Sequence, residues 1–216
     1  TIVITGSFGK TGTKDAIYSA LKDVRHVRRS RKSFNSRIGV PLTIIGAPSG
    51  WRDVLKWLRV IMKGWWVWLC PWYQYPDTLV LEVGVSHPGD MQRLRRWVQP
   101  SVVVVASFGT VPSHVEHYDN PEAVWKEEAS IIDALNPQKG VLILNHDDDQ
   151  VYALRHRKAG TVMTYGFDEA ADVRITDYEL VYTDERLTGV RYTLRSDDQS
   201  ITCHRQDVLG ASYAYY

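Results

Sequence analysis

Short runs of β-branched and other apolar residues alternate along the chain with segments long enough to form helices. The apolar runs cover residues 2–5, 78–83, 102–107, 141–145 and 161–165. Between them we expect helices at residues 10–23, 52–69, 91–97, 121–135 and 149–158. Continuous apolar runs are typical of strands that are buried on both faces. The pattern therefore predicts an α/β fold with a mostly parallel sheet that is flanked by helices.

The pattern changes towards the C-terminal end of the sequence. Residues 173–183 and 189–196 alternate between apolar and polar positions with a period of two, around a turn segment at 184–189. Such alternation indicates an antiparallel β-hairpin. We therefore expect residues 173–203 to form a β appendage at the sheet edge, within one domain of residues 1–216.

Composition narrows the class of protein without naming a function. A chain of 216 residues with 44% hydrophobic content can bury one substantial core. Its formal net charge of +1 creates no field that would recruit nucleic acid, so we expect no nucleic-acid partner. Two cysteines and no visible secretory signal predict a reduced, cytoplasmic setting. Because the sequence starts with Thr1 inside an apolar run and stops at ASYAYY, we expect a piece of a longer protein.

The first apolar run leads into a glycine-containing turn, TGSFGKTGTK at residues 5–14. A strand, such a turn and a helix N-terminus suit a polyphosphate, because backbone N–H groups and the helix dipole point at the anion. Lys10 would reach the β- and γ-phosphates, and the Thr11 hydroxyl would ligate Mg²⁺. The usual P-loop pattern requires a glycine six positions before the lysine, where this chain has Ile4. The expected ATP-binding residues of the loop are Gly6, Ser7, Gly9, Lys10, Thr11, Gly12 and Thr13.

This loop and five later segments together resemble the signature motifs of the Mur ligase family. In the order of the family they read TGSFGKTGTK, SFNSRIGVPLTIIG, LVLEVGVSHPGDM, VVVVASFGTVPSHVEHYDNPEAV, GVLILNHDDDQV and VMTYGFDEAADV. The closing VLGASYAYY also resembles a helix start of the family, with Ser212 in place of the usual polar ring. Six motifs in order are far more specific than one. The resemblance implies a P-loop-type sheet and the central ATPase domain of the family, without its N-terminal and C-terminal substrate domains.

The resemblance also implies an activity. Members of the family join a carboxylate to an amine through an acyl phosphate, in peptidoglycan precursor synthesis. The implied cofactors are ATP and Mg²⁺, and the implied partners are a UDP-muramoyl-peptide-like substrate and an amino acid or dipeptide, with D-alanyl-D-alanine as the best match. A folylpolyglutamate- or cyanophycin-synthetase-like ligase and a non-catalytic ATP-binding module remain alternatives. We expect a monomer, and poor activity from these residues alone.

Individual residues receive roles from the same resemblance. Lys10 is implied to act as a catalytic cation, since acyl-phosphate chemistry brings several anions together. Glu82 lies at the end of an apolar run, where α/β sheets place ligands, and it is implied to ligate Mg²⁺ together with Thr11. His114 is the implied ligand of a second Mg²⁺. Further nucleotide contacts are implied for Asn35, Asn145 and Asp148. A solvent-facing Glu82 and an ordinary loop histidine at position 114 remain alternatives.

One position departs from the family in a way that bears on catalysis. The family commonly has a lysine there that CO₂ converts into a carbamate supporting the second metal, and this position falls on Glu128. Lys126 should lie about 200° around the helix and face elsewhere. We therefore expect Glu128 to act as a permanent carboxylate at the metal site, with an exposed Glu128 as the alternative. We interpret Glu116 and His117 as surface residues, and Phe8 as a residue that stacks on a ligand or covers the loop.

Two further stretches are unusual in composition. Residues 25–32 form a dense basic run, for which we favour a solvated loop over a nucleic-acid contact. Residues 51–72 hold six of the eight tryptophans, and basic residues recur there every three to four positions. The stretch is too interrupted to span a bilayer. Two interpretations remain for it: packing in the fold or against another domain, which we favour, and peripheral contact of residues 52–72 with anionic lipid.

Overall fold

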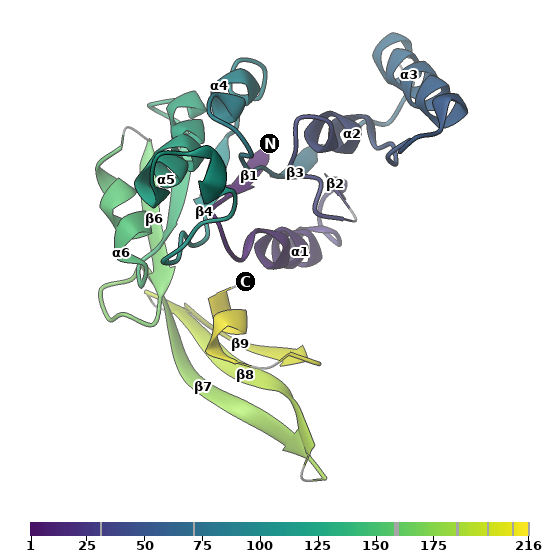
Figure 1. Ribbon diagram of the computed structural model, residues 1–216. Coiled ribbons are helices and arrows are strands. Elements are labelled where there is room, and N and C mark those ends of the chain that lie inside the picture. Colours follow the sequence, from purple (N-terminus) through teal and green to yellow (C-terminus); the bar gives the residue numbers. More distant parts are fainter. Residues whose placement is uncertain are drawn as a thin grey trace.

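The protein is described by a computed structural model that covers residues 1–30, 32–70, 72–157, 160–184, 186–197, 199–208 and 210–215. Within these residues one nine-stranded sheet has the strand order β2-β3-β1-β4-β5-β6-β7-β8-β9 (Figure 1). Neighbouring strands from β2 to β7 run parallel, and the last three are antiparallel. The predicted fold class is therefore confirmed.

The parallel strands coincide with the apolar runs of the sequence, apart from one strand at the edge. They are β1 (Ile2–Thr5), β2 (Val27–Arg29), β3 (Thr78–Glu82), β4 (Val102–Val105), β5 (Val141–Asn145) and β6 (Thr161–Gly166). Val3 and Ile4 point to opposite faces of the central strand β1, and both are fully buried. Burial on both faces explains why these strands lack polar alternation.

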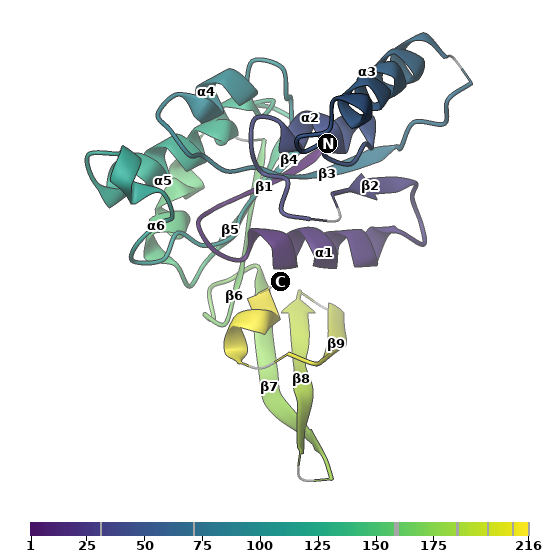
Figure 2. The same ribbon diagram turned by 45° about the vertical axis from the view of Figure 1, so that its right-hand side comes forward.

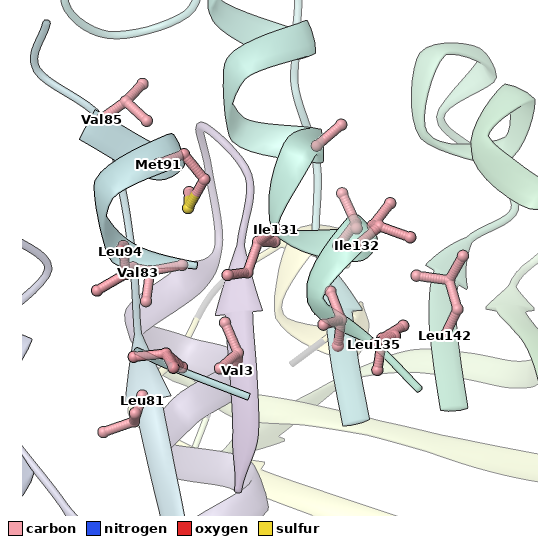
Figure 3. Close-up of a cluster of buried hydrophobic side chains, with 14 of the residues drawn as sticks. Val3, Leu81, Val83, Val85, Met91, Leu94, Ile131, Ile132, Leu135 and Leu142 are labelled. Atoms are coloured by element: carbon pink, nitrogen blue, oxygen red, sulfur yellow. The ribbon is translucent and has the colours of Figure 1, made fainter. Parts of the chain in front are cut away.

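Helices cover the two faces of the parallel part unequally. The helices are α1 (Lys10–Leu21), α2 (Gly39–Ile45), α3 (Val54–Leu69), α4 (Asp90–Leu94), α5 (Pro121–Ala129) and α6 (Asp149–Tyr152). Four short 3₁₀ turns lie among the described residues: η1 (Val115–His117), η2 (Ser130–Ala134), η3 (Ala153–His156) and η4 (Ala211–Tyr215). The larger core cluster joins one face of the sheet to α2, α4, α5, η2 and α6. Figure 3 shows its part around α4 and η2. On the other face Ile4 and Val104 belong to a cluster that Ile17 of α1 covers.

The C-terminal strands form the predicted antiparallel hairpin and add a third strand to it. β7 (Val173–Thr183), β8 (Arg186–Ser196) and β9 (Gln199–Gln206) project away from the helices (Figures 1 and 2). They have a small core of their own around Ile175, Val190 and Tyr192, on which η4 places Ala214. Glu185 and Asp198, within the predicted appendage, lie outside the described residues.

The prediction of a solvated loop at residues 25–32 was wrong in its centre, where β2 pairs with β3. The arginines of β2 find partners, and this makes a basic edge strand possible. Arg28 donates to the Ile44 carbonyl (2.6 Å) and to the Tyr73 hydroxyl (2.8 Å), while Arg29 pairs with Asp15 (3.1 Å). Arg31 lies outside the described residues.

The helices differ from the predictions mainly in length. α2 was not predicted, and its Pro41 stands in the first turn, where proline is tolerated. The expected helices at 121–135 and 149–158 each end early and continue as a 3₁₀ turn, and Lys158 lies outside the described residues. Among the described residues, no helix is both long and apolar enough to cross a membrane.

Candidate nucleotide-binding site

The turn between β1 and α1 is held in a shape that requires glycine at two positions. Gly6 has φ +121°, and a Cβ atom there would lie 2.8 Å from the carbonyl oxygen of Ser107. Gly9 has φ +80°, in the left-handed region. The same Ser107 carbonyl accepts hydrogen bonds from the backbone of Ser7 (2.7 Å) and Phe8 (3.0 Å). The loop is therefore fixed against the end of β4.

The N-terminus of α1 is suited to an anion. Gly9 caps it without a side-chain hydrogen bond, and the first turn contains no acidic residue. The backbone of Thr13 makes the first intrahelical bond, to the Gly9 carbonyl (2.9 Å), so the N–H groups before it have no partner inside the helix. Lys10 curls over the loop and donates to the carbonyls of Gly6 and Ser7. Free N–H groups and a cation at a helix N-terminus form a polyphosphate cradle.

Glu82 connects this cradle to the neighbouring strand. Its side chain is buried at the end of β3 and accepts a hydrogen bond from the Thr11 hydroxyl (3.0 Å). Ser33 donates to the other carboxylate oxygen, and the Asn35 amide lies 3.5 Å from it. Glu82 does not face solvent, so the structure excludes that alternative. The two expected ligands Thr11 and Glu82 lie side by side, with Asn35 adjacent.

Lys14 is a functional candidate that the sequence analysis missed. Its side chain is fully buried and lies 3.4 Å from the Glu82 carboxylate. The signal was present, because Lys14 closes the TGSFGKTGTK motif and follows Lys10 by four residues on the same helix face. Ser33 gave no such signal, since it reaches Glu82 only through the fold.

Glu128 is buried beside the loop and is not exposed. Its carboxylate accepts a hydrogen bond from the Ser7 hydroxyl (3.1 Å). Burial raises the pKa of Glu128, while the nearby charge of Lys10 and the Ser7 bond oppose this shift. Lys126 is exposed and pairs with Glu122 (3.9 Å), so the prediction that it faces elsewhere is confirmed.

His114 is placed differently from the other expected metal ligands. It has φ +64°, is about half exposed, and lies 3.7 Å from Glu116. His117 is exposed as expected and stacks on His87, with ring centroids 4.4 Å apart. In the part of the chain that is described, no group of three or more His, Cys, Asp or Glu side chains could hold a metal ion. The contacts of His114 therefore do not join it to Glu82.

Asn145 and Asp148 follow β5 and have structural contacts of their own. Asn145 is buried and accepts from the backbone of Asp147 (3.0 Å). One oxygen of Asp148 caps α6, and the other accepts from the Ser107 hydroxyl (2.7 Å) and the Phe108 backbone (2.9 Å). Asp148 thus ties the end of β5 to the segment that fixes the phosphate loop.

A cavity of about 470 Å³ lies between the phosphate loop and the end of β3. It is lined by loop residues 7–12, by Ser33, Asn35 and Glu82, and by Ser212 and Tyr213 of the C-terminal segment. A cavity of about 580 Å³ lies near Thr1 and Ser101, at the opposite ends of β1 and β4. Parallel sheets bind ligands at the C-terminal ends of their strands, so the first cavity is the candidate site.

Known proteins with similar sequences are named as UDP-N-acetylmuramoyl-tripeptide–D-alanyl-D-alanine ligases. Over 197 residues the chain is 28% identical to the UDP-N-acetylmuramoyl-tripeptide–D-alanyl-D-alanine ligase of Mycobacterium bovis. The matched region covers 91% of this chain and 32% of that protein. The ligase of the same name from Bacillus subtilis is 27% identical over 194 residues, with coverages of 90% and 35%. The chain thus spans about a third of the length of these relatives.

Solved structures with the same fold carry related names. MurF from Acinetobacter baumannii superimposes with a TM-score of 0.73 at 23% identity, covering 99% of this chain and 40% of that chain. MurF ligase from Thermotoga maritima, solved in complex with ADP, gives a TM-score of 0.69 at 21% identity, covering 100% and 42%. At these identities the similarity shows the fold alone.

The family assignment comes from a different part of the sequence than the phosphate loop. Residues 72–210 match the Mur ligase middle domain, which is more than half of the chain. This region contains Glu82, His114 and Glu128, whereas the loop at residues 5–14 precedes it. Two independent regions therefore agree, and the chain belongs to the Mur ligase family.

Proposed function

We propose that this chain is the central ATP-binding domain of a ligase that joins a carboxylate to an amine through an acyl phosphate in peptidoglycan precursor synthesis. The observation that carries the proposal is the contact between Thr11 and Glu82 (3.0 Å) beside Lys10, at the C-terminal edge of the sheet. The names of the curated relatives support a UDP-muramoyl tripeptide and D-alanyl-D-alanine as the substrates. We also propose that flanking domains of the longer protein bind these substrates.

The residues of the loop have separate roles in this proposal. Backbone N–H groups at the start of α1 hold the phosphates, and Lys10 places a positive charge beside them. Lys10 can turn towards a phosphate because its present partners are two carbonyls of its own loop. Asn35 and Asn145, each at the C-terminal side of the sheet, are proposed to contact the nucleotide. Asp148 positions the Ser107 segment that fixes the loop.

The residues present also fit Mg²⁺. Thr11 and Glu82 offer a hydroxyl and a carboxylate within hydrogen-bonding distance of each other. Mg²⁺ in nucleotide sites prefers one or two such oxygen ligands, completed by phosphate and water. When bound, it supplies positive charge at the transferred phosphoryl group. His114 remains a proposed ligand of a second ion.

Glu128 decides between the ligase and a second candidate, an ATP-binding module without turnover. Its burial 3.1 Å from the Ser7 hydroxyl favours the ligase, because a permanent carboxylate then stands where the family carries a carbamate. Two departures from the family favour the module: the side chain of Glu128 is shorter than a carbamylated lysine, and Phe8 in the loop is half exposed.

Two measurements test the proposal. This chain should bind ADP or ATP with Mg²⁺ in a calorimetric titration. The longest protein that its reading frame encodes should release phosphate only when a UDP-muramoyl tripeptide and D-alanyl-D-alanine are both present. ATP binding without substrate-dependent phosphate release would support the module instead. Release that depends on a folate and glutamate would support the sister ligase. Monomeric state and cytoplasmic location remain predictions.

A further inference from the structure

Helix α3 stands at the margin of the domain and is attached to it by a narrow face. Figures 1 and 2 show it beyond α2, on the side away from β7–β9. Asp53 caps its N-terminus through the backbone of Leu55 (3.0 Å) and Lys56 (3.2 Å), so the helix is well defined. Val60 is its one buried residue within the described range, and it packs with Trp57 against Leu42 of α2. The attachment therefore uses one side of the helix only.

The side of α3 that faces away from the domain is apolar. Nine of its large hydrophobic side chains, including Leu58, Trp65 and Leu69, are 53–80% exposed. At about 100° per residue, these nine fall within one sector of about 160° around the helix axis. An apolar sector of this size on a domain surface marks an interaction site.

A row of cations runs along one margin of this sector. Lys56, Arg59 and Lys63 lie within about 60° of one another around the axis, between the apolar sector and the face that packs on α2. Residues 54–69 contain no acidic side chain. Asp53, just before the helix, pairs with Lys56 (3.4 Å), and Lys63 donates to the Gly46 carbonyl. The charge of Arg59 is therefore the one most available to a ligand outside the domain.

Exposed tryptophans lie at both ends of α3 and contribute to its apolar sector. Trp51 precedes the helix, Trp65, Trp66 and Trp68 occupy its last turns, and Trp72 follows it; all five are exposed. Tryptophan is enriched at the level of lipid headgroups, where its ring is apolar and its N–H remains hydrated. A 16-residue helix with a cationic margin is too short and too charged to span a bilayer, but it can lie in its surface.

We propose that α3 binds the surface of a membrane that contains anionic phospholipid and thereby holds the nucleotide site next to that membrane. The apolar sector enters the boundary of the acyl chains, while Arg59 and its neighbours reach the phosphate layer. Charge selects this partner, since the row of cations without a carboxylate in residues 54–69 complements an anionic surface. The proposal does not depend on the ligase activity, because it rests on α3 alone.

Vesicle flotation tests the proposal. The chain should float with phosphatidylglycerol/phosphatidylcholine vesicles and much less with phosphatidylcholine alone, and raised salt should weaken the binding. Arg59→Glu should reduce partition to the mixed vesicles by about tenfold or more. The control Arg96→Glu reverses an exposed arginine just after α4, outside α3 and its row of cations, and should change nothing.

A second pair of variants tests the apolar sector. Leu58→Gln with Leu69→Gln should abolish flotation, whereas Ile201→Gln, at an exposed position of β9, should float as the unchanged chain does. Far-ultraviolet circular dichroism spectra and Tm should be equal in all variants, which shows that they are folded. The proposal is overturned if the chain ignores vesicles of both compositions or binds both equally. It is also overturned if light scattering shows a concentration-dependent dimer of the unsubstituted chain and only monomer for the leucine variants, because a second copy then covers the sector.

Discussion

Lys14 and Glu82 form an ion pair that is closed off from solvent. The Nζ atom of Lys14 lies 3.4 Å from Oε2 of Glu82, and the two side chains are 0% and 1% exposed. The pair joins the first helix to the strand beside β1, and Thr11 donates to the same carboxylate oxygen. Lys14 therefore positions Glu82 without reaching the cavity itself. A fixed carboxylate loses little freedom when a cation binds, which is the value of such a partner.

Removal of the lysine tests this positioning role. Lys14→Met should lower the free energy of unfolding by about 3 kcal/mol or more, because it leaves a buried carboxylate without its partner. Urea denaturation measures this change. Lys22→Met, at an exposed position just after the same helix, should cost less than about 0.5 kcal/mol. The double variant Lys14→Met/Glu82→Gln should recover part of the loss, and a double variant as unstable as the sum of the single ones would exclude the coupling.

Lys10 offers a direct test of nucleotide binding. Lys10→Ala should weaken binding of Mg²⁺-ADP by at least about tenfold, or about 1.4 kcal/mol, because it removes the cation of the loop. Titration calorimetry provides the affinity. Lys126→Ala is the matched control, since that lysine is exposed and pairs only weakly, at 3.9 Å, with Glu122. Equal affinity of both variants would show that the phosphates bind elsewhere.

The pattern of apolar positions predicted much of the fold, because the parallel strands are buried on both faces. β2 escaped prediction since its three residues lie inside a basic run, and pairing with Thr78–Val80 gives them strand structure. The tryptophan-rich helix packs in the fold through one face, around Val60, and packing of the remaining faces against another domain stays a prediction. No local pattern tells which partner an apolar helix meets, or whether it meets one.

The candidate site was predictable where one motif carries its residues. Lys10 and Thr11 lie in a single turn, and Glu82 ends a neighbouring strand, so topology alone brings them together. The position of His114 depends on the long segment between β4 and α5, whose path no periodicity determines. Ser33 likewise reaches Glu82 from a loop. Contacts made by loops depend on the whole fold, so they could not be predicted from local patterns in the sequence.

Glu128 should make stability depend on pH in the absence of metal. Its raised pKa means that the folded state keeps the proton to higher pH than the unfolded state, whose carboxyl ionises near 4.5. The folded state then binds more protons, so stability falls as pH rises above about 4.5, by up to about 1.4 kcal/mol per pH unit. Glu128→Gln should remove this fall and raise Tm at pH 8 relative to the unchanged chain, with little difference at pH 4.

The same variant tests the proposed role at the metal. Thermal unfolding is recorded first with a chelator and then with Mg²⁺-ATP. The ligand should stabilise the unchanged chain more than Glu128→Gln, because bound cations favour an ionised carboxylate. Full ligase activity of Glu128→Gln in the longer protein would contradict the role, and inactivity with intact folding would support it. Glu122→Gln, on the exposed side of α5, should behave as the unchanged chain.

Phe8 and Gly109 form a contact that explains how this loop accommodates an aromatic residue. A Cβ atom on Gly109 would lie 2.6 Å from the Phe8 ring, and Gly109 has φ +62°. Gly109→Ala should therefore lower stability by more than the about 1 kcal/mol that left-handed backbone alone costs. Gly89→Ala isolates the backbone cost, because Gly89 has φ +84° and nothing lies within 4 Å of an added Cβ.

A double-mutant cycle separates the two contributions at Gly109. In the background of Phe8→Ala, the cost of Gly109→Ala should fall to that of Gly89→Ala, since the ring is no longer in the way. Chemical denaturation of the four chains gives the coupling free energy. If Gly109→Ala destabilises the Phe8→Ala chain as much as the unsubstituted chain, the Phe8 ring moves aside freely and its contact with Gly109 does not hold it over the loop. Binding of ADP to Phe8→Ala completes the test: unchanged affinity identifies Phe8 as a cover of the loop, and weaker affinity identifies it as a contact of the nucleotide.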